Sequence, residues 1–204
     1  MDKTIKNYIF DLGNVLVHFD PMGMTKAYVQ DQETAQLIGS VVFDRLYWDP
    51  LDDGTITDEA LKEACHARLP EELHAVADKV YDNWYAHLPF IDGMPELVLD
   101  IKRSGARVIL LSNVSAGFAE NYHRVPGFKN LFSHFDGLVF SGPLGIIKPN
   151  AEIFHHLLNR FDLKAESCIF IDDSAKNIAG AEAVGIRGYL FDGDAAKLRN
   201  ALGF

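Results

Sequence analysis

Uninterrupted apolar runs along this chain alternate with segments whose apolar residues recur at helical spacing. The runs at 8–10 and 168–171 are rich in β-branched and aromatic side chains, which is typical of strands buried on both faces of a sheet. Similar runs predict further strands at 107–111, 137–140 and 188–191. From residue 89 onward helical segments and strands alternate, and this order predicts a parallel sheet wrapped by helices.

The region between the first two predicted strands has helical periodicity instead. We expect helices over 21–30 and 33–47, from Thr57 onward, and over 71–87, with Asp52-Asp53-Gly54 as the turn before the third. About four helices are enough for a small bundle. The predicted fold class is therefore α/β, a Rossmann-like parallel sheet with helices on both faces (1–17 and 89–204) and an inserted α-helical cap (18–88).

Composition narrows the function classes. A chain of 204 residues with 48% hydrophobic residues can fill a sizeable core, and the net charge of -10 argues against a nucleic-acid surface. We recognise no leader and no apolar stretch long enough to span a bilayer, so we expect a cytoplasmic protein. Cys65 and Cys168 lie far apart without metal-ligand partners, which favours two reduced thiols over a disulfide.

Carboxylates follow two predicted strands that lie far apart in the sequence. Asp11 follows the first strand, and Asp172 and Asp173 follow the fourth. In an open parallel sheet the carboxyl ends of the strands share one edge, where ligands bind, so these side chains can meet there. Converging carboxylates need a cation, and a small set of hard oxygen ligands suits Mg²⁺, which usually shares its shell with a phosphate. The pattern therefore points to phosphate chemistry.

Four short motifs stand at strand ends or in adjoining loops: Asp11-Leu12-Gly13-Asn14-Val15, Leu111-Ser112-Asn113, Ile147-Lys148-Pro149 and Ile171-Asp172-Asp173-Ser174-Ala175-Lys176-Asn177. In order and spacing they resemble the haloacid dehalogenase (HAD) superfamily of hydrolases, and the match covers nearly the whole chain. The helical insert is similar in position to that superfamily's small α-helical cap. The run 10–15 resembles the branch that contains glucose-1-phosphate phosphatase-like proteins and the phosphatase domain of epoxide hydrolases.

The resemblance implies a nucleophile and a metal site. Asp11 would attack phosphorus and form an aspartyl-phosphate that water later cleaves. Mg²⁺ would be held by the Asp11 carboxylate, the main-chain carbonyl of Gly13 and Asp173. Asp172 would either bind the ion itself or lie just behind it.

The remaining motif residues are expected to bind the substrate or support the site. Ser112 offers a hydroxyl donor to the phosphoryl group, and Asn113 offers an amide or main-chain donor. Lys148 would place a positive charge between nucleophile and phosphate, which stabilises charge spread over the phosphoryl oxygens. Asn177 would orient the acidic pair. The aromatic residues Trp48, Trp84 and Tyr85 are expected to pack in the cap rather than stack on substrate.

One position departs from the superfamily pattern. Most phosphatases of this kind carry an aspartate two residues after the nucleophile as general acid and base, and Gly13 stands there. Such a group contributes about 10²- to 10⁴-fold in rate, or roughly 3 to 5 kcal/mol. A leaving group that needs little protonation, such as the anomeric oxygen of a sugar 1-phosphate, is the compensation we favour. Alternatively His18 or Asp20 donates a proton, although Asp20 before Pro21 suits a helix cap, or the enzyme is slow.

The sequence thus predicts a Mg²⁺-dependent phosphatase of a small phosphorylated metabolite, with sugar phosphates as the favoured class. A metal-independent haloacid dehalogenase is the first alternative, since Ser112-Asn113 also occurs in that branch, but the pair Asp172-Asp173 argues against it. A non-catalytic phosphate-binding regulatory module on the same scaffold is the second. The sequence determines neither the substrate nor the oligomeric state.

Overall fold

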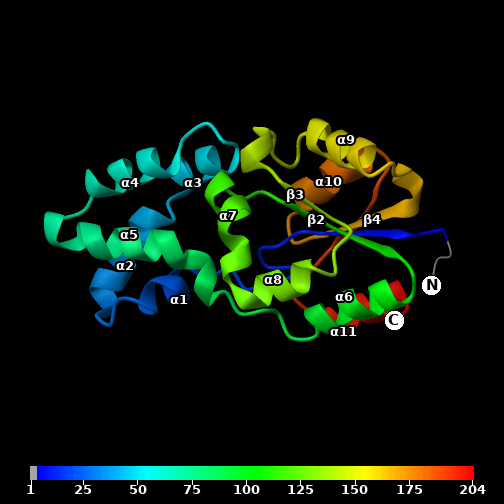
Figure 1. Cartoon of the computed structure of the whole chain (residues 1–204), viewed down its shortest axis with the longest axis horizontal. Helices are drawn as coiled ribbons and strands as arrows, with labels where there is room; N and C mark the ends of the chain where they lie inside the picture. The colour runs from blue at the N-terminus through cyan, green and yellow to red at the C-terminus, as the bar shows by residue number, and fades with distance from the viewer. Residues whose placement is uncertain (1–3) are drawn as a thin grey trace.

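A five-stranded, all-parallel sheet forms one half of the molecule (Figure 1). The computed structural model describes residues 4–204, so the first three residues of the expected leaderless start lie outside the described part. The strand order is β3-β2-β1-β4-β5, which puts β1 at the centre. The strands are β1 (Asn7–Phe10), β2 (Arg107–Ser112), β3 (Gly137–Phe140), β4 (Cys168–Asp172) and β5 (Arg187–Leu190).

Helices cover both faces of the sheet, as the alternation predicted. On one face lie α6 (Met94–Arg103), α7 (Ala116–Asn121), η3 (Tyr122–Arg124), α8 (Pro126–Phe132) and α11 (Ala195–Leu202), and on the other lie α9 (Ala151–Arg160) and α10 (Ala175–Ala183). Short turns η4 (Gly142–Leu144) and η5 (Ala165–Ser167) precede α9 and β4. Side chains alternate between two cores, with Phe10 and Leu110 in one and Ile9 and Phe170 in the other, because strand residues point to opposite faces.

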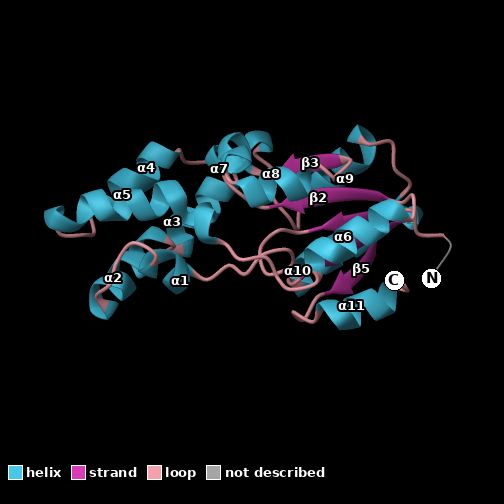
Figure 2. Cartoon of the chain, turned by 60° about the horizontal axis from the view of Figure 1, so that its bottom comes forward, coloured by secondary structure: helices cyan, strands magenta, loops and turns pink. Residues whose placement is uncertain are grey.

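The other end of the molecule is helical (Figure 2). It consists of α1 (Pro21–Lys26), α2 (Gln32–Val42), α3 (Arg45–Asp52), α4 (Asp58–His66), η1 (Glu71–Leu73), α5 (His74–Asn83) and η2 (Trp84–His87). The expected helix over 33–47 is two helices, because the Asp44 carboxylate accepts a hydrogen bond from Leu46 N (3.0 Å) and begins a new helix. Asp52 belongs to α3 rather than to the turn that we expected.

The chain passes between the two halves along paired extended segments. His18 N donates to Pro89 O, and Ile91 N donates to Leu16 O, each at 2.9 Å. The expected cap boundaries, 18 and 88, fall at this crossing and stay a prediction.

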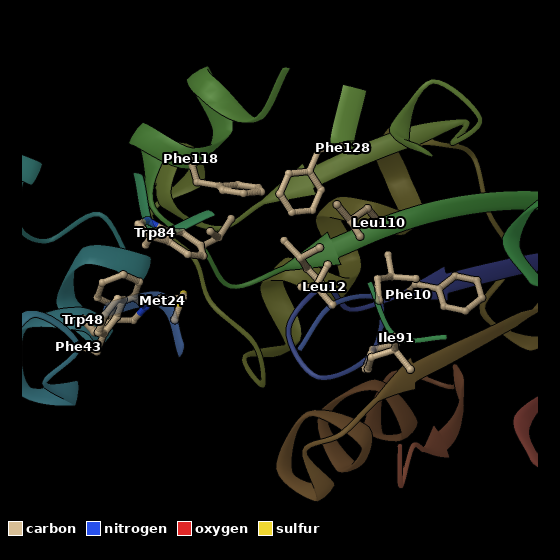
Figure 3. Packing of buried hydrophobic residues seen from close by; sticks show 14 of the residues in the cluster. Phe10, Leu12, Met24, Phe43, Trp48, Trp84, Ile91, Leu110, Phe118 and Phe128 are labelled. Carbon is tan, nitrogen blue, oxygen red and sulfur yellow. The ribbon is translucent and has the colours of Figure 1, made fainter. Parts of the chain in front are cut away.

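A continuous apolar core joins the two halves (Figure 3). Trp84 of the helical end stacks on Phe118 of α7 with ring centroids 5.5 Å apart. Trp48 and Trp84 are buried, and the half-buried Tyr85 packs edge-on against Phe118. These aromatics therefore pack in the core as expected, and the expectation that they do not stack on substrate stays a prediction. The large shared core indicates that the helical end is held against the sheet by burial of apolar surface.

Cys65 and Cys168 are both buried free thiols, as predicted. Within residues 4–204, no helix has the length and apolar character needed to cross a bilayer.

Candidate active site

The strand-end residues meet at the carboxyl edge of the central strands. Asp11 directly follows β1 and its N–H donates to Ile171 O of β4 (2.9 Å). Ser112 ends β2, and Asp172 ends β4. Because β2, β1 and β4 are adjacent and parallel, residues remote in the sequence are brought to one place.

Lys148 lies between two of these carboxylates. Its Nζ is 2.8 Å from Asp11 Oδ1 and 2.7 Å from Asp172 Oδ2. The lysine is 2% exposed. Burial alone would lower the pKa of Lys148, but the charges of Asp11 and Asp172 outweigh it and hold that pKa above its usual value. The site therefore contains a buried cation next to the predicted nucleophile.

Asn113 fixes the backbone that carries this lysine. Its Nδ2 donates to Lys148 O (3.0 Å), and its Oδ1 accepts from Lys148 N (2.9 Å). The peptide bond between Lys148 and Pro149 is cis. The side-chain amide of Asn113 is thus occupied by the Lys148 backbone. We had expected Asn113 to offer the phosphoryl group either this amide or its main-chain N–H, and the main-chain N–H is the donor that remains.

Asp172 is surrounded by donors of the protein itself. Its Oδ1 accepts from Ser174 N (2.8 Å) at the start of α10, and Asn177 Nδ2 lies 3.1 Å from both carboxylate oxygens. Its Oδ2 also accepts from Lys148. Asp172 is fully buried. Both oxygens are thus engaged, and the arrangement fits a residue that positions Lys148 better than one that binds an ion.

Asp173 faces outward and has one partner that sequence analysis missed. Asn14 Nδ2 donates to Asp173 Oδ2 (3.3 Å), while Asn14 Oδ1 accepts from Phe19 N (3.1 Å). Burial and then the charge of Asp172 raise the pKa of Asp173. Asn14 has a φ of 53°, a conformation that asparagine tolerates better than most residues. The dipeptide Gly13-Asn14 was the available signal, because it marks a tight turn.

The acidic residues fit a divalent cation. Asp11, Asp172 and Asp173 each offer a carboxylate oxygen, and these oxygens lie within 4.8 Å of one another. Burial raises the pKa of Asp11 to about 7, against the opposing charge of Lys148, and the charge of Asp172 raises it further. One buried cation therefore does not neutralise the cluster. A hard cation bound by oxygen atoms would relieve the remaining repulsion, and Mg²⁺ is suited to such a donor set.

A cleft of about 470 Å³ opens onto these groups. Core residues form its floor: Asp11, Gly13, Asn14, Ser112, Asn113, Ile147, Lys148, Pro149, Asp173, Ser174, Lys176 and Asn177. The helical end supplies the opposite wall: Phe19, Arg45, Trp48, Asp49 and Asp52. Neither alternative acid lines the cleft. His18 is exposed, and Asp20 Oδ1 accepts from Met22 N (3.1 Å) and caps α1.

Known proteins resemble this chain in sequence and fold. A sesquiterpene phosphatase of Aspergillus oryzae is 26% identical, over 92% of this chain and 90% of its own. Bifunctional epoxide hydrolase 2 of Mus musculus is 25% identical over 87% of this chain, which spans about a third (31%) of that protein. A HAD-family enzyme of Bacteroides thetaiotaomicron, solved with magnesium and inorganic phosphate, superposes with a TM-score of 0.70 at 21% identity, over 95% of this chain and 98% of its own.

The sequence profile of a hydrolase family matches most of the chain. The matched family is described as haloacid dehalogenase-like hydrolase, and the match extends over residues 5–185. That range includes all four strand-end motifs and the helical insert. The chain therefore belongs to the haloacid dehalogenase-like hydrolase family.

Proposed function

We propose that this protein is a Mg²⁺-dependent phosphatase that hydrolyses a small phosphorylated metabolite through an aspartyl-phosphate on Asp11. The observation that carries the proposal is the position of Lys148, whose Nζ lies within 2.8 Å of Asp11 Oδ1 while Asp173 completes an acidic cluster beside it. A buried cation beside an attacking carboxylate is suited to a reaction in which an anion attacks an anion. Relatives named as phosphatases support the reaction class.

Each residue of the site has its own role in the proposed reaction. The Asp11 carboxylate attacks phosphorus, and the bond to the leaving oxygen breaks as the aspartyl-phosphate forms. Lys148 and the Ser112 hydroxyl face the phosphoryl oxygens and stabilise their charge. Water then cleaves the aspartyl-phosphate, which releases inorganic phosphate and restores Asp11.

The metal ion would be held by the carboxylates of Asp11 and Asp173 and by the main-chain carbonyl of Gly13. Bound there, Mg²⁺ would neutralise charge on the phosphate oxygens and help to orient the substrate. Asp172 would support this arrangement by accepting a hydrogen bond from Lys148, and Asn177 would support it by donating one to Asp172.

A small substrate agrees with the size of the cleft, which lies in the range of ordinary metabolite sites. Sugar phosphates remain the class that we favour. A cytoplasmic location and the lack of a nucleic-acid partner stay predictions.

Phosphate release from a panel of phosphorylated metabolites, assayed with Mg²⁺ and with excess EDTA, tests the proposal. We expect release with Mg²⁺ only, and its loss in Asp11→Asn. Asp31→Asn is the matched control, because Asp31 caps α2 outside the cleft and asparagine caps equally well. Activity on haloacids that survives EDTA would instead indicate a dehalogenase. Binding of phosphorylated ligands without any phosphate release would indicate a non-catalytic module.

A further inference from the structure

The structure assigns Asp52 of the helical end as the general acid and base that Gly13 cannot provide. This inference rests on the proposed phosphatase function and adds the proton donor that the function lacks. Asp52 ends α3 and lines the same cleft as Asp11 and Lys148. No residue of the first motif other than Asp11 brings a carboxylate to that cleft.

The Asp52 carboxylate is buried without a full set of partners. The residue is 7% exposed, and its Oδ1 atom has no hydrogen-bond partner among the residues that the structure describes. A buried polar atom left unpaired costs about 1 to 3 kcal/mol. Asp52 lines the proposed substrate cleft, and such a cost in a cleft residue is expected where a ligand supplies the missing partner.

The position of Asp52 is fixed by the core rather than by the helical end alone. Ser141 Oγ donates to the main-chain oxygen of Asp52 (2.6 Å) and accepts from Val114 N (2.9 Å). Val114 follows Ser112 and Asn113, so one buried serine links Asp52 to the loop that bears two predicted substrate contacts. The turn that follows α3 also packs closely against the core, because a Cβ atom built on Gly54 would lie 2.7 Å from Gly142 O.

The charges around Asp52 permit it to hold a proton near neutral pH. Burial raises the pKa of Asp52 to about 7. Arg45 of its own helix lowers this pKa, whereas Asp49 on the same helix and Asp11 across the cleft raise it, and Lys148 lowers it. The Arg45 guanidinium is paired with Asp49 (2.7 Å). A carboxyl group with a pKa near the working pH is an efficient proton donor and acceptor.

Asp52 gives up one proton in the first half-reaction and regains one in the second. In the first, the Asp52 carboxyl gives its proton to the leaving oxygen while the phosphorus–oxygen bond to that group breaks and the bond to Asp11 forms. In the second, the Asp52 carboxylate takes a proton from the attacking water. The bond between phosphorus and Asp11 then breaks, and inorganic phosphate, the free Asp11 carboxylate and the protonated Asp52 result.

The dependence of rate on the leaving group tests this assignment. Asp52→Asn should lower kcat/KM for an alkyl phosphate by about 100-fold or more, and for 4-nitrophenyl phosphate by less than about tenfold, because nitrophenolate leaves without a proton. With 4-nitrophenyl phosphate the variant should also show a burst equal to the enzyme concentration, since water attack on the aspartyl-phosphate has lost its base. The wild type should show no burst.

Asp53→Asn is the matched control. It removes the same charge one residue away, outside the cleft lining, and asparagine retains the hydrogen bond that Thr55 N donates to Asp53 Oδ1 (2.8 Å). This variant should behave as the wild type does with both substrates.

Equal losses of kcat/KM with both substrates, or no loss with either, would overturn the role of Asp52. If Asp52→Asn fails to fold, the wild type alone decides: a steep fall of kcat/KM with rising leaving-group pKa would show that no acid operates. If the wild type releases no phosphate from any phosphomonoester, the proposed phosphatase function is itself overturned, and the role of Asp52 is overturned with it.

Discussion

Asn113 and Lys148 are joined by two reciprocal hydrogen bonds, one from the asparagine amide to the lysine carbonyl (3.0 Å) and one from the lysine N–H to the asparagine oxygen (2.9 Å). The pair connects the end of β2 to the loop before α9. These two hydrogen bonds hold the backbone of Lys148 at the end of β2, the strand that also carries Ser112.

Asn113→Ala should therefore reduce activity by displacing Lys148. Two hydrogen bonds contribute about 1 to 3 kcal/mol together, so we expect kcat/KM to fall about ten- to hundredfold and the Tm to fall as well. Asn83→Ala is the control, because the half-buried Asn83 lies outside the cleft and donates within its own helix, to Lys79 O (2.9 Å). Full activity in Asn113→Ala would show that the lysine is held by other contacts.

Asp172 and Asp173 should respond differently to substitution. Mg²⁺ that binds only the folded protein raises the Tm with concentration. Asp173→Asn should abolish this rise, because it removes a predicted ligand from the exposed side of the cluster. Asp172→Asn should instead lower the Tm in EDTA, because it removes the buried partner of Lys148. Thermal denaturation over a range of Mg²⁺ concentrations measures both effects. A normal Mg²⁺ response in Asp173→Asn would exclude that residue as a ligand.

The free energy of unfolding of the metal-free protein should decrease between about pH 4 and pH 7. Burial raises the pKa of Asp52 from 3.8 to about 7, so the folded state binds the proton more tightly than the unfolded state does. The stabilisation is present at low pH and is lost as the pH rises through that interval, by up to about 1.4 kcal/mol per pH unit for one such group.

Asp52→Asn removes this contribution and should therefore gain stability relative to the wild type as the pH rises from about 4 to 7. Denaturant unfolding in EDTA at several pH values measures the difference. The free energy of unfolding of Asp53→Asn should change with pH in the same way as that of the wild type. A constant difference between Asp52→Asn and the wild type would mean that Asp52 titrates alike in the folded and unfolded chains.

Gly13→Asp should restore activity to Asp52→Asn. A Cβ built on Gly13 has Phe19 Cβ as its nearest neighbour at 3.9 Å, which is an ordinary contact. The new carboxylate would stand two residues after the nucleophile, where most phosphatases of the superfamily carry their acid. We expect the double variant to regain at least about tenfold in kcat/KM for an alkyl phosphate. If the two substitutions merely add their losses, the missing function is not proton transfer.

The meeting of the strand-end residues could be predicted from the sequence, because it depends on a simple rule of parallel sheets. Asp11, Ser112 and Asp172 each end or follow a continuously apolar run, and such runs place their ends at one edge. A positive charge of Lys148 beside the nucleophile was also expected from its motif. These residues need only the order of the strands to be correct.

Asp52 and Asn14 could not be predicted in the same way. Asp52 lies in a helix-end segment that resembles an ordinary turn, and only its docking on Ser141, 89 positions further along the chain, brings it to the cleft. Asn14 acquires its contact to Asp173 through a left-handed backbone conformation. The break between α2 and α3 was missed because Asp44 is polar within an otherwise helical pattern, and its capping bond is visible only in the structure.

Detection of phosphate on Asp11 is the most direct measurement of the central claim. The protein would be mixed with Mg²⁺ and a radiolabelled phosphomonoester, quenched in acid within the first turnover and analysed by peptide mass spectrometry. Asp52→Asn and Asp53→Asn would be treated in parallel. We expect one phosphoryl group on the peptide that contains Asp11, with more of it in Asp52→Asn than in Asp53→Asn. Rapid phosphate release with no label on Asp11, or with label on another residue, would contradict the account.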